Sequence, residues 1–307
     1  MSLMRNTLLW VSENPTMRRT LPNQAFVKKA VKRFMPGEEL RDALDAAAGL
    51  KGKGISTILT HLGENISERE EAERVRDHYI GALGEISQGG HNAQVSVKLT
   101  QLGLDLEEDF CLRNLTAIIR AAAERKNTVW IDMEQSRYVD RTISIFKKAR
   151  AGSRDVGLCL QSYLLRTEKD LGDLLPIEPS IRLVKGAYAE PANVAYKKKS
   201  DVDENYVRLA KTLLDSAKKG KASVGIATHD PALINWAMKR ATDEGCPKEN
   251  YEFQLLYGVR AEEQTRIAAE GYRIRTLISY GSFWFPWYVR RLAERPANVL
   301  FVIKNLF

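Results

Sequence analysis

The segment AQVSVKLTQLGLDLEEDFCLRNLTAIIRAAAE, residues 93–124, decides the fold class. Its first part, Ala93–Thr100, is a short β-rich run, and in its second part, Leu106–Glu124, Ala, Leu, Glu and Arg recur at helical spacing. A strand followed directly by a helix is one βα unit, and successive units of this kind predict a parallel sheet. The same alternation of short and long runs continues along the chain from about Lys51 to its end.

Seven more β-rich runs give eight predicted strands in total. The other seven are Ile55–Leu62, Thr128–Glu134, Val156–Gln161, Ile181–Gly186, Ser223–His229, Tyr251–Gly258 and Arg273–Ser279. Eight even units without a long linker favour a closed barrel over an open doubly wound sheet. We therefore predict an α/β fold, a (β/α)8 barrel in a single domain of residues 1–307. Residues 1–50 are expected to add helices, 51–295 to form the barrel, and 296–307 to form a C-terminal tail.

Composition narrows the class of protein without fixing a partner. Apolar residues make up 44% and charged residues 28% of the chain, which are ordinary globular values. The three cysteines show no CxxC spacing, and no apolar run is long enough to span a bilayer, so we expect a cytoplasmic protein. The net charge of +8 suits an anionic ligand, an anionic membrane surface or nucleic acid equally well.

Two segments bear on possible partners. The densest basic run, Lys197–Lys199, is followed by acidic residues and contains no aromatic side chains on which bases would stack, so we predict no nucleic-acid partner. The apolar run Asn298–Phe307 is expected to pack against the barrel. A dimer interface or a peripheral contact with the inner face of the cell membrane is the alternative, and the positive net charge would assist the membrane contact.

Polar residues occur at the predicted strand ends, where the active site of a barrel is built. Cations are prominent among them, and guanidinium and ammonium groups facing one cavity would bind a carboxylate or phosphate. The basic pair Arg290-Arg291 on the last helix fits a solvated surface as well as a ligand site. The four histidines have no metal-binding spacing, so we predict no metal. The polar residues at the strand ends include Lys98, Asp132, Gln161, Arg182, Lys185, Thr228, His229 and Gln254.

One string, Arg182-Leu183-Val184-Lys185-Gly186-Ala187-Tyr188, is specific enough to suggest a family. With seven further strings, the chain from about Ile55 onward resembles the flavin-dependent proline dehydrogenases of the short monofunctional bacterial type. The seven are Gly63-Glu64, Val97–Thr100, Asp132–Glu134, Leu160-Gln161, Ala227–His229, Phe253–Gly258 and Tyr288–Glu294.

The resemblance implies a distorted (β/α)8 barrel that binds FAD. The implied reaction oxidises L-proline to Δ1-pyrroline-5-carboxylate by hydride transfer to flavin N5, with the electrons passed to a quinone. Carried over by motif, the residues implied to bind substrate are Lys98, Asp132, Leu183, Ala187, Tyr188, Leu256, Leu277, Arg290, Arg291 and Glu294. The residues implied to bind the cofactor are Gln161, Arg182, Val184, Lys185, Gly186, Thr228, His229 and Gln254.

Several pairings follow from these implied roles. Positive charge from Arg182 and Lys185 would stabilise a reduced, anionic flavin. Asp132 is expected to pair with Lys98 and to orient its ammonium group. Glu64 is expected to pair with Arg291 as a gate over the bound substrate.

The chain departs from the family pattern at Leu277, where a tyrosine usually packs on the substrate ring. The substrate could therefore be hydroxyproline or another cyclic secondary amine. Alternatively, the aromatic cluster at Tyr280, Phe283, Trp284 and Trp287 could refill the space. Two readings that do not depend on the family stay open: an aldolase that forms a Schiff base on Lys185, and a non-catalytic barrel that binds a partner through its basic residues.

Overall fold

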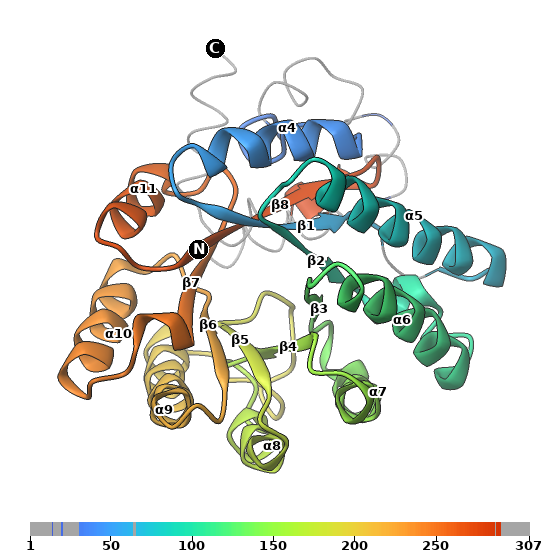
Figure 1. Ribbon diagram of the computed structural model, residues 1–307. Helices are drawn as coiled ribbons and strands as arrows, with labels where there is room; N and C mark the ends of the chain where they lie inside the picture. Colours follow the sequence, from blue (N-terminus) through green and yellow to red (C-terminus); the bar gives the residue numbers. More distant parts are fainter. Residues whose placement is uncertain (1–13, 15–19, 21–30, 64–65, 286, 290–307) are drawn as a thin grey trace.

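Eight parallel strands close into a barrel in the order in which they occur in the chain (Figure 1). The computed structural model describes residues 14, 20, 31–63, 66–285 and 287–289. Strand β8 pairs with β1, which closes the barrel and confirms the predicted fold class. The strands are β1 (Ser56–His61), β2 (Ala93–Val97), β3 (Val129–Ile131), β4 (Val156–Gln161), β5 (Ser180–Val184), β6 (Ser223–Ile226), β7 (Tyr251–Leu256) and β8 (Ile274–Tyr280).

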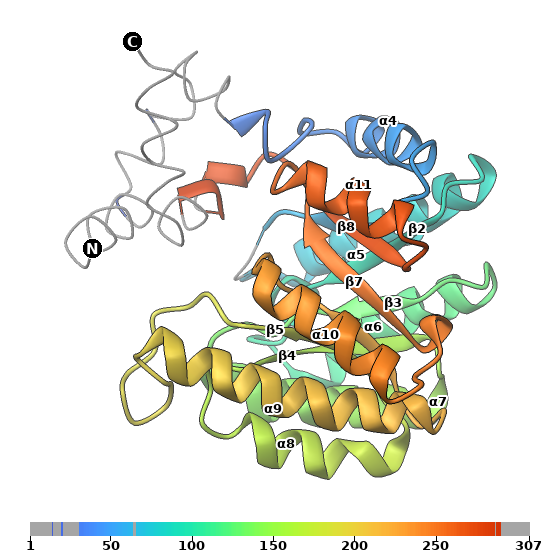
Figure 2. The ribbon, with the colours of Figure 1, turned by 90° about the vertical axis from the view of Figure 1, so that its left-hand side faces the viewer.

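Helices surround this barrel, as Figure 2 shows from the side. They are α4 (Leu40–Lys51), α5 (Arg69–Gln88), α6 (Glu108–Ala123), α7 (Val139–Gly152), α8 (Thr167–Leu174), α9 (Lys199–Lys218), α10 (Pro231–Asp243) and α11 (Ala261–Ala269). Short 3₁₀ helices also occur, at η2 (Leu99–Leu102), η3 (Ser136–Tyr138), η4 (Leu175–Ile177) and η5 (Lys248–Asn250). Helix α4 belongs to the predicted N-terminal helices, whereas most of residues 1–30 and the tail 296–307 lie outside the described residues.

Six of the eight strands end earlier than the sequence predicts, and β2, β3 and β6 each end three residues earlier. Strand β2 stops at Val97 because the 3₁₀ helix η2 begins at Leu99, and β3 stops at Ile131. Lys98 and Asp132 therefore lie just beyond the strands, at the carboxyl end of the barrel. This is the end at which active sites of such barrels are found.

Side chains alternate between the two faces of each strand. On β5, Ile181 and Leu183 are fully buried in the main hydrophobic core, together with residues from the surrounding helices. Arg182 lies between them and bonds to side chains from β2 and β7 across the inside of the barrel. On β5 the outward residues Ile181 and Leu183 are therefore apolar, whereas Arg182 carries a positive charge into the barrel interior.

Glycines on two strands make room for large inward side chains. A Cβ atom on Gly157 would lie 2.6 Å from the ring of Trp130, and one on Gly225 would lie 2.8 Å from the amide of Gln254. These glycines flank β5, which pairs with β4 and with β6. The missing Cβ atoms thus let side chains from β3 and β7 reach the centre of the barrel beside Arg182.

Among the residues that the structure describes, no helix is both long enough and apolar enough to cross a membrane.

Candidate functional site

Asp132 joins three strands at the carboxyl end of the barrel. Its Oδ1 accepts hydrogen bonds from Ser96 Oγ at 2.7 Å and from Arg182 Nη1 at 2.8 Å. Its Oδ2 accepts one from Lys98 Nζ at 3.4 Å, which confirms the predicted pairing of Lys98 with Asp132. One carboxylate therefore holds the two cations that the sequence places at the ends of β2 and in β5.

The charge of Asp132 is favoured by these neighbours. Burial alone would raise the pKa of its carboxyl group, but the charges of Lys98 and Arg182 and the bond from Ser96 outweigh burial. The pKa of Asp132 is consequently lowered below its usual value. The cluster has two cations and one carboxylate, so its excess charge is positive and suits an anion.

Among the described residues, the guanidinium of Arg182 is held by its neighbours at Nε and Nη1 but not at Nη2. Its Nε donates to Gln254 Oε1 at 2.7 Å, and its guanidinium lies over the ring of Trp130, 4.9 Å from the ring centroid. Within the described part of the chain, its Nη2 is buried without a hydrogen-bond partner. A buried guanidinium nitrogen without an acceptor is costly, so this atom points to a ligand that accepts a hydrogen bond.

Within the described ranges of the chain, Gln161, at the end of β4, has an unpaired buried acceptor where Arg182 has an unpaired buried donor. Its Nε2 donates to the backbone oxygen of Met133 at 3.2 Å, whereas its Oε1 is buried with no donor among the residues described. A free buried donor on β5 and a free buried acceptor on β4 therefore lie on neighbouring strands. A ligand that presents both an acceptor and a donor would satisfy both groups.

Three apolar side chains, those of Val184, Leu256 and Leu277, lie nearer the carboxyl end of the barrel than Arg182 and Gln254, and we call them the apolar rim. Leu256 and Leu277 are register partners on β7 and β8, and both are partly exposed. Leu256 lies two residues after Gln254 and Leu277 two residues after Arg275. Gln254 and Arg275 bond to groups inside the barrel, so the two leucines share the inward face. Val184 occupies the same inward position on β5, two residues after Arg182, and is also partly exposed. The substrate contacts implied for Leu256 and Leu277 and the cofactor contact implied for Val184 stay predictions.

The aromatic residues at and after the end of β8 have different surroundings. Tyr280 lies on the outward face, where its hydroxyl is 2.8 Å from His78 Nε2 on helix α5. Trp284 and Trp287 pack in a second apolar cluster with Phe34, apart from the main core. Phe283 is 61% exposed. Tyr280 is therefore directed away from Leu277, whereas compensation by Phe283, Trp284 and Trp287 stays a prediction.

Lys185 lies on the other side of β5 from Arg182. Its Nζ donates to Asp203 on α9 and, at 3.1 Å, to Oδ2 of Asp230, the N-cap residue of α10. Lys199 bonds to the same two carboxylates. The expectation that Lys98, Arg182 and Lys185 face one cavity is corrected here, because strand alternation directs Lys185 toward the helices.

The two carboxylates around Lys185 are strongly stabilised in their charged form. Burial alone would raise the pKa of Asp203 and of Asp230, but the bonds and charges of Lys185 and Lys199 outweigh it and lower both pKa values. The four groups form two cations and two anions that tie β5 to α9 and α10. In this arrangement Lys185 Nζ is engaged by the helices and is not presented to a substrate at the barrel mouth, which argues against a Schiff-base aldolase.

The ends of β6 and β7 are also tied together. His229 Nε2 accepts a hydrogen bond from the backbone N–H of Leu256 at 3.3 Å, so a neutral His229 carries its proton on Nδ1. Thr228 Oγ1 accepts from the N–H of Asp230 at 3.2 Å. Both residues lie at the carboxyl end of the barrel, as the sequence predicts.

The loop after β5 is anchored at both ends. Gly186 has a φ of +110°, and a Cβ atom there would overlap the ring of Tyr163, so only glycine fits. Farther on, the Glu190 carboxylate accepts from the Ser136 N–H at 2.7 Å and from its Oγ at 2.5 Å. These contacts position Ala187 and Tyr188, which lie between the two anchors and are partly exposed.

Some predicted site residues have other positions or lie outside the description. Leu183 is fully buried in the main core and alternates with Arg182, so its contact with a substrate ring stays a prediction. Glu64, Arg290, Arg291 and Glu294 lie outside the described residues, and so does the predicted gate between Glu64 and Arg291.

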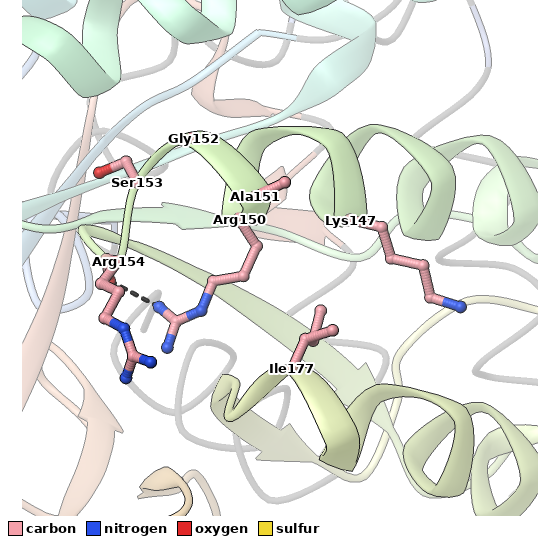
Figure 3. Close-up of a pocket in the computed structure, with 7 residues that line it drawn as sticks. All are labelled: Lys147, Arg150, Ala151, Gly152, Ser153, Arg154 and Ile177. Atoms are coloured by element: carbon pink, nitrogen blue, oxygen red, sulfur yellow. Dashed lines mark hydrogen bonds between the residues drawn. The ribbon is translucent and has the colours of Figure 1, made fainter.

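The structure also has a pocket away from this site, and we do not take it as the functional site. It lies where α7 leads into β4, at the amino end of that strand, and has a volume of about 340 Å³ (Figure 3). Its most deeply placed cation, Arg150, donates to three backbone oxygens, those of Arg154, Val156 and Glu178. Arg150 therefore joins α7 to the following strands, at the end of the barrel opposite the Asp132 cluster.

The sequence analysis missed several residues of the interior. They are Ser96, Trp130, Glu252 and Arg275 inside the barrel, and Glu190 in the loop after β5. The two-residue alternation of side chains along a strand would have identified the first four. Ser96, Trp130 and Glu252 each lie two residues before a predicted site residue, namely Lys98, Asp132 and Gln254. Arg275 is the register partner of Gln254.

Comparison with known proteins agrees with these features. The sequence profile of the family described as Proline dehydrogenase matches residues 43–304. Proline dehydrogenase 2 of Bacillus subtilis subsp. natto is 35% identical over 306 residues, covering 100% of this chain and 99% of the relative. Proline dehydrogenase of Deinococcus radiodurans is 36% identical over 309 residues, covering 99% and 98%.

A solved structure shares the fold. Proline utilization A from Bdellovibrio bacteriovorus, inactivated by N-propargylglycine, superimposes with a TM-score of 0.81 at 24% identity. The match covers 87% of this chain and 33% of that longer chain, so this chain spans about a third of its length. The profile match over most of the chain and the full-length relatives show that this chain belongs to the proline dehydrogenase family.

Proposed function

We propose that the chain is a FAD-dependent proline dehydrogenase that oxidises L-proline to Δ1-pyrroline-5-carboxylate and passes the electrons to a quinone. The oxidoreductase class follows from the family. The observation that carries the proposal is the Asp132 cluster, in which one buried carboxylate holds Lys98 and Arg182 at the carboxyl end of the barrel. The cofactor, the product and the acceptor belong to the proposal.

The residues present fit a flavin. The isoalloxazine ring system carries hydrogen-bond acceptors and one N–H donor, and the site offers the unpartnered Arg182 Nη2 and Gln161 Oε1. Arg182 would lie closest to the ring, where its positive charge favours electron transfer to the cofactor. The other residues that we propose to contact FAD are Val184, Gly186, Thr228, His229 and Gln254, and also Lys185, which would do so only through its backbone because its Nζ is engaged by Asp203 and Asp230.

The substrate would be held by charge at one end and by apolar surface at the other. Lys98, oriented by Asp132, would bind the carboxylate, with Arg290, Arg291 and Glu294 proposed to complete that end. Leu256, Leu277, Ala187 and Tyr188 would enclose the ring, and Leu183 is kept as a proposed neighbour. Fixing both ends of a small ring aims one of its C–H bonds, which lowers the entropic part of the barrier.

The chemistry requires removal of a hydride and a proton. The ring carbon next to nitrogen loses the hydride, the nitrogen loses a proton, and a C=N bond forms between them. Bound FAD supplies the hydride acceptor. The apolar rim would exclude water from the reacting carbon. The excess positive charge of the Asp132 cluster disfavours a further cation at the substrate, so the neutral amine is favoured.

Quinone reduction leads us to propose a cytoplasmic protein that contacts the inner face of the cell membrane. The net charge of +8 supports attraction to an anionic lipid surface. We propose no nucleic-acid partner and no metal.

The visible spectrum of the purified protein tests the proposed function. We expect a flavin absorption band that bleaches when L-proline is added without oxygen, with a product that lacks two hydrogens. A colourless protein that takes up no added FAD would contradict the proposal. A flavin that bleaches only with hydroxyproline or another cyclic secondary amine would support the second candidate, which the position of Leu277 on the apolar rim favours.

A further inference from the structure

Glu252 lies below the Asp132 cluster, inside the barrel, and none of the roles described so far includes it. It is 7% exposed and precedes Gln254 by two residues on β7, so both side chains point inward. Gln254 Nε2 donates to Glu252 Oε1 at 2.6 Å, and Gln254 Oε1 accepts from Arg182 Nε at 2.7 Å. The amide of Gln254 therefore links a carboxylate to the guanidinium of the proposed flavin site.

Only one orientation of the Gln254 amide satisfies both neighbours. A carboxylate offers acceptors alone, so the NH₂ group must face Glu252. A guanidinium offers donors alone, so the amide oxygen must face Arg182. The carboxylate of Glu252 thus determines that an acceptor, and not a donor, meets Arg182 Nε. Gly225 provides the space, because a Cβ atom there would lie 2.8 Å from this amide.

Arg275 stabilises the negative charge of Glu252. Arg275 Nε donates to its Oε1 at 3.0 Å, and Arg275 Nη2 donates to its Oε2 at 3.2 Å. Burial alone would raise the pKa of Glu252, but the charge and bonds of Arg275, with the bond from Gln254, outweigh burial and lower the pKa. Arg275 is itself directed away from the flavin site, and its Nη1 bonds to the backbone oxygen of Thr57.

We propose that Glu252 is a positioning residue that acts through Gln254 to fix the guanidinium of Arg182 toward the cofactor. Asp132 and Ser96 then hold Nη1 of Arg182, and Gln254 holds its Nε. Within the described residues Nη2 has no partner, so it is the donor left for a ligand. The proposal rests on the proposed function, because it assigns Arg182 to the flavin. Without the carboxylate, the amide is free to turn its NH₂ group toward Arg182 Nε, where two donors repel.

Three variants that all lack Arg275 separate positioning from folding. Glu252→Gln alone would leave the Arg275 charge buried without a partner, and this can unfold the protein. Arg275→Met keeps the Glu252–Gln254–Arg182 link, and the Glu252 carboxylate keeps a cationic partner because Arg273 Nη2 lies 3.5 Å from its Oε2. Glu252→Gln with Arg275→Met replaces the carboxylate by an amide oxygen that can still accept from Gln254. Glu252→Met with Arg275→Met removes the acceptor without leaving a buried charge unpaired.

FAD affinity and the flavin midpoint potential of the three variants form the first readout. We expect Arg275→Met and the Gln-containing double variant to bind FAD within about threefold of each other. The Met-containing double variant should bind about tenfold more weakly, the effect of one misdirected charge-assisted hydrogen bond, and its potential should shift from that of the other two. Equal affinities and equal potentials in all three variants would overturn the proposal.

A readout without flavin separates this proposal from the proposed function. In an NMR spectrum of the apoprotein, the Arg182 Nε–H signal should show a persistent hydrogen bond in the first two variants and lose it in the Met-containing double variant. If the wild-type protein takes up no FAD, the proposed function fails while this spectrum still tests the link. An Arg182 signal that is the same in all three variants would overturn the role of Glu252.

Discussion

Arg182 lies on β5 and Lys185 directly follows the last residue of that strand, yet their side chains serve opposite faces of the barrel. Arg182 points inward and contacts Asp132, Gln254 and the ring of Trp130. Lys185 points outward and contacts Asp203 and Asp230 on two helices. Both are cations in one short motif, so the difference arises from strand alternation alone. A motif therefore identifies the residues of a site, whereas the strand geometry decides which of them can act together.

The carboxylates on the two faces provide the first test of this contrast. Asp132→Asn removes the charge that holds Lys98 and Arg182 in place, and we expect kcat/KM for L-proline to fall about 100-fold, a loss of about 3 kcal/mol. Asp203→Asn, the matched change on the outward face, should alter kcat/KM less than about threefold because Lys185 keeps Asp230. Steady-state kinetics of the two variants measure the contrast.

Equal losses of kcat/KM in Asp132→Asn and Asp203→Asn would contradict the division into an inward site and an outward structural cluster. Thermal unfolding of both variants serves as the control, because Asp203 ties α9 to β5 and its loss should lower the unfolding midpoint.

A second outward cluster predicts a pH dependence of stability. The His61 ring lies 4.5 Å from the His78 ring and 5.3 Å from the Tyr280 ring, between the barrel and α5. Burial, followed by the charges of His78 and Lys98, lowers the pKa of His61 to about 4. The unfolded chain therefore binds a proton at His61 that the folded protein does not bind, in the range from pH 6.5 down to about pH 4.

Stability should consequently fall as the pH falls through that range, with His61 contributing on the order of 2 kcal/mol of the loss. His61→Phe should retain the folded state and flatten this part of the profile, which denaturant unfolding at several pH values would measure. If the slope of stability against pH were the same in His61→Phe as in the wild type, His61 would not be the group that titrates in this range.

The smallest expected effect concerns the apolar rim of the inward face. Leu277→Tyr restores the ring that the family usually has at this position, beside Leu256 on the neighbouring strand. We expect the ratio of kcat/KM values for proline and hydroxyproline to change about fivefold, since one side chain of a binding wall contributes modestly to discrimination. A ratio equal to that of the wild type would show that Leu277 does not read the substrate.

Much of the fold was predictable because each βα unit has a local signature. All eight strands were identified from short β-rich runs, and the pairing of Asp132 with Lys98 was correctly predicted. The direction of Lys185 was not predicted, because it follows from the two-residue alternation that continues past the end of β5 and not from the motif. Glu252 and Arg275 were missed since each gains its partner only when β7 and β8 pair.

The rate at which L-proline reduces the bound flavin tests the central claim most directly. It should be measured by anaerobic stopped-flow absorbance with Arg182→Met and Lys185→Met, each saturated with FAD so that binding differences do not contribute. We predict that Arg182→Met slows reduction at least about 100-fold, because a preorganised charge at the site is lost. Lys185→Met should reduce within about threefold of the wild type. A larger loss in Lys185→Met than in Arg182→Met would contradict the account.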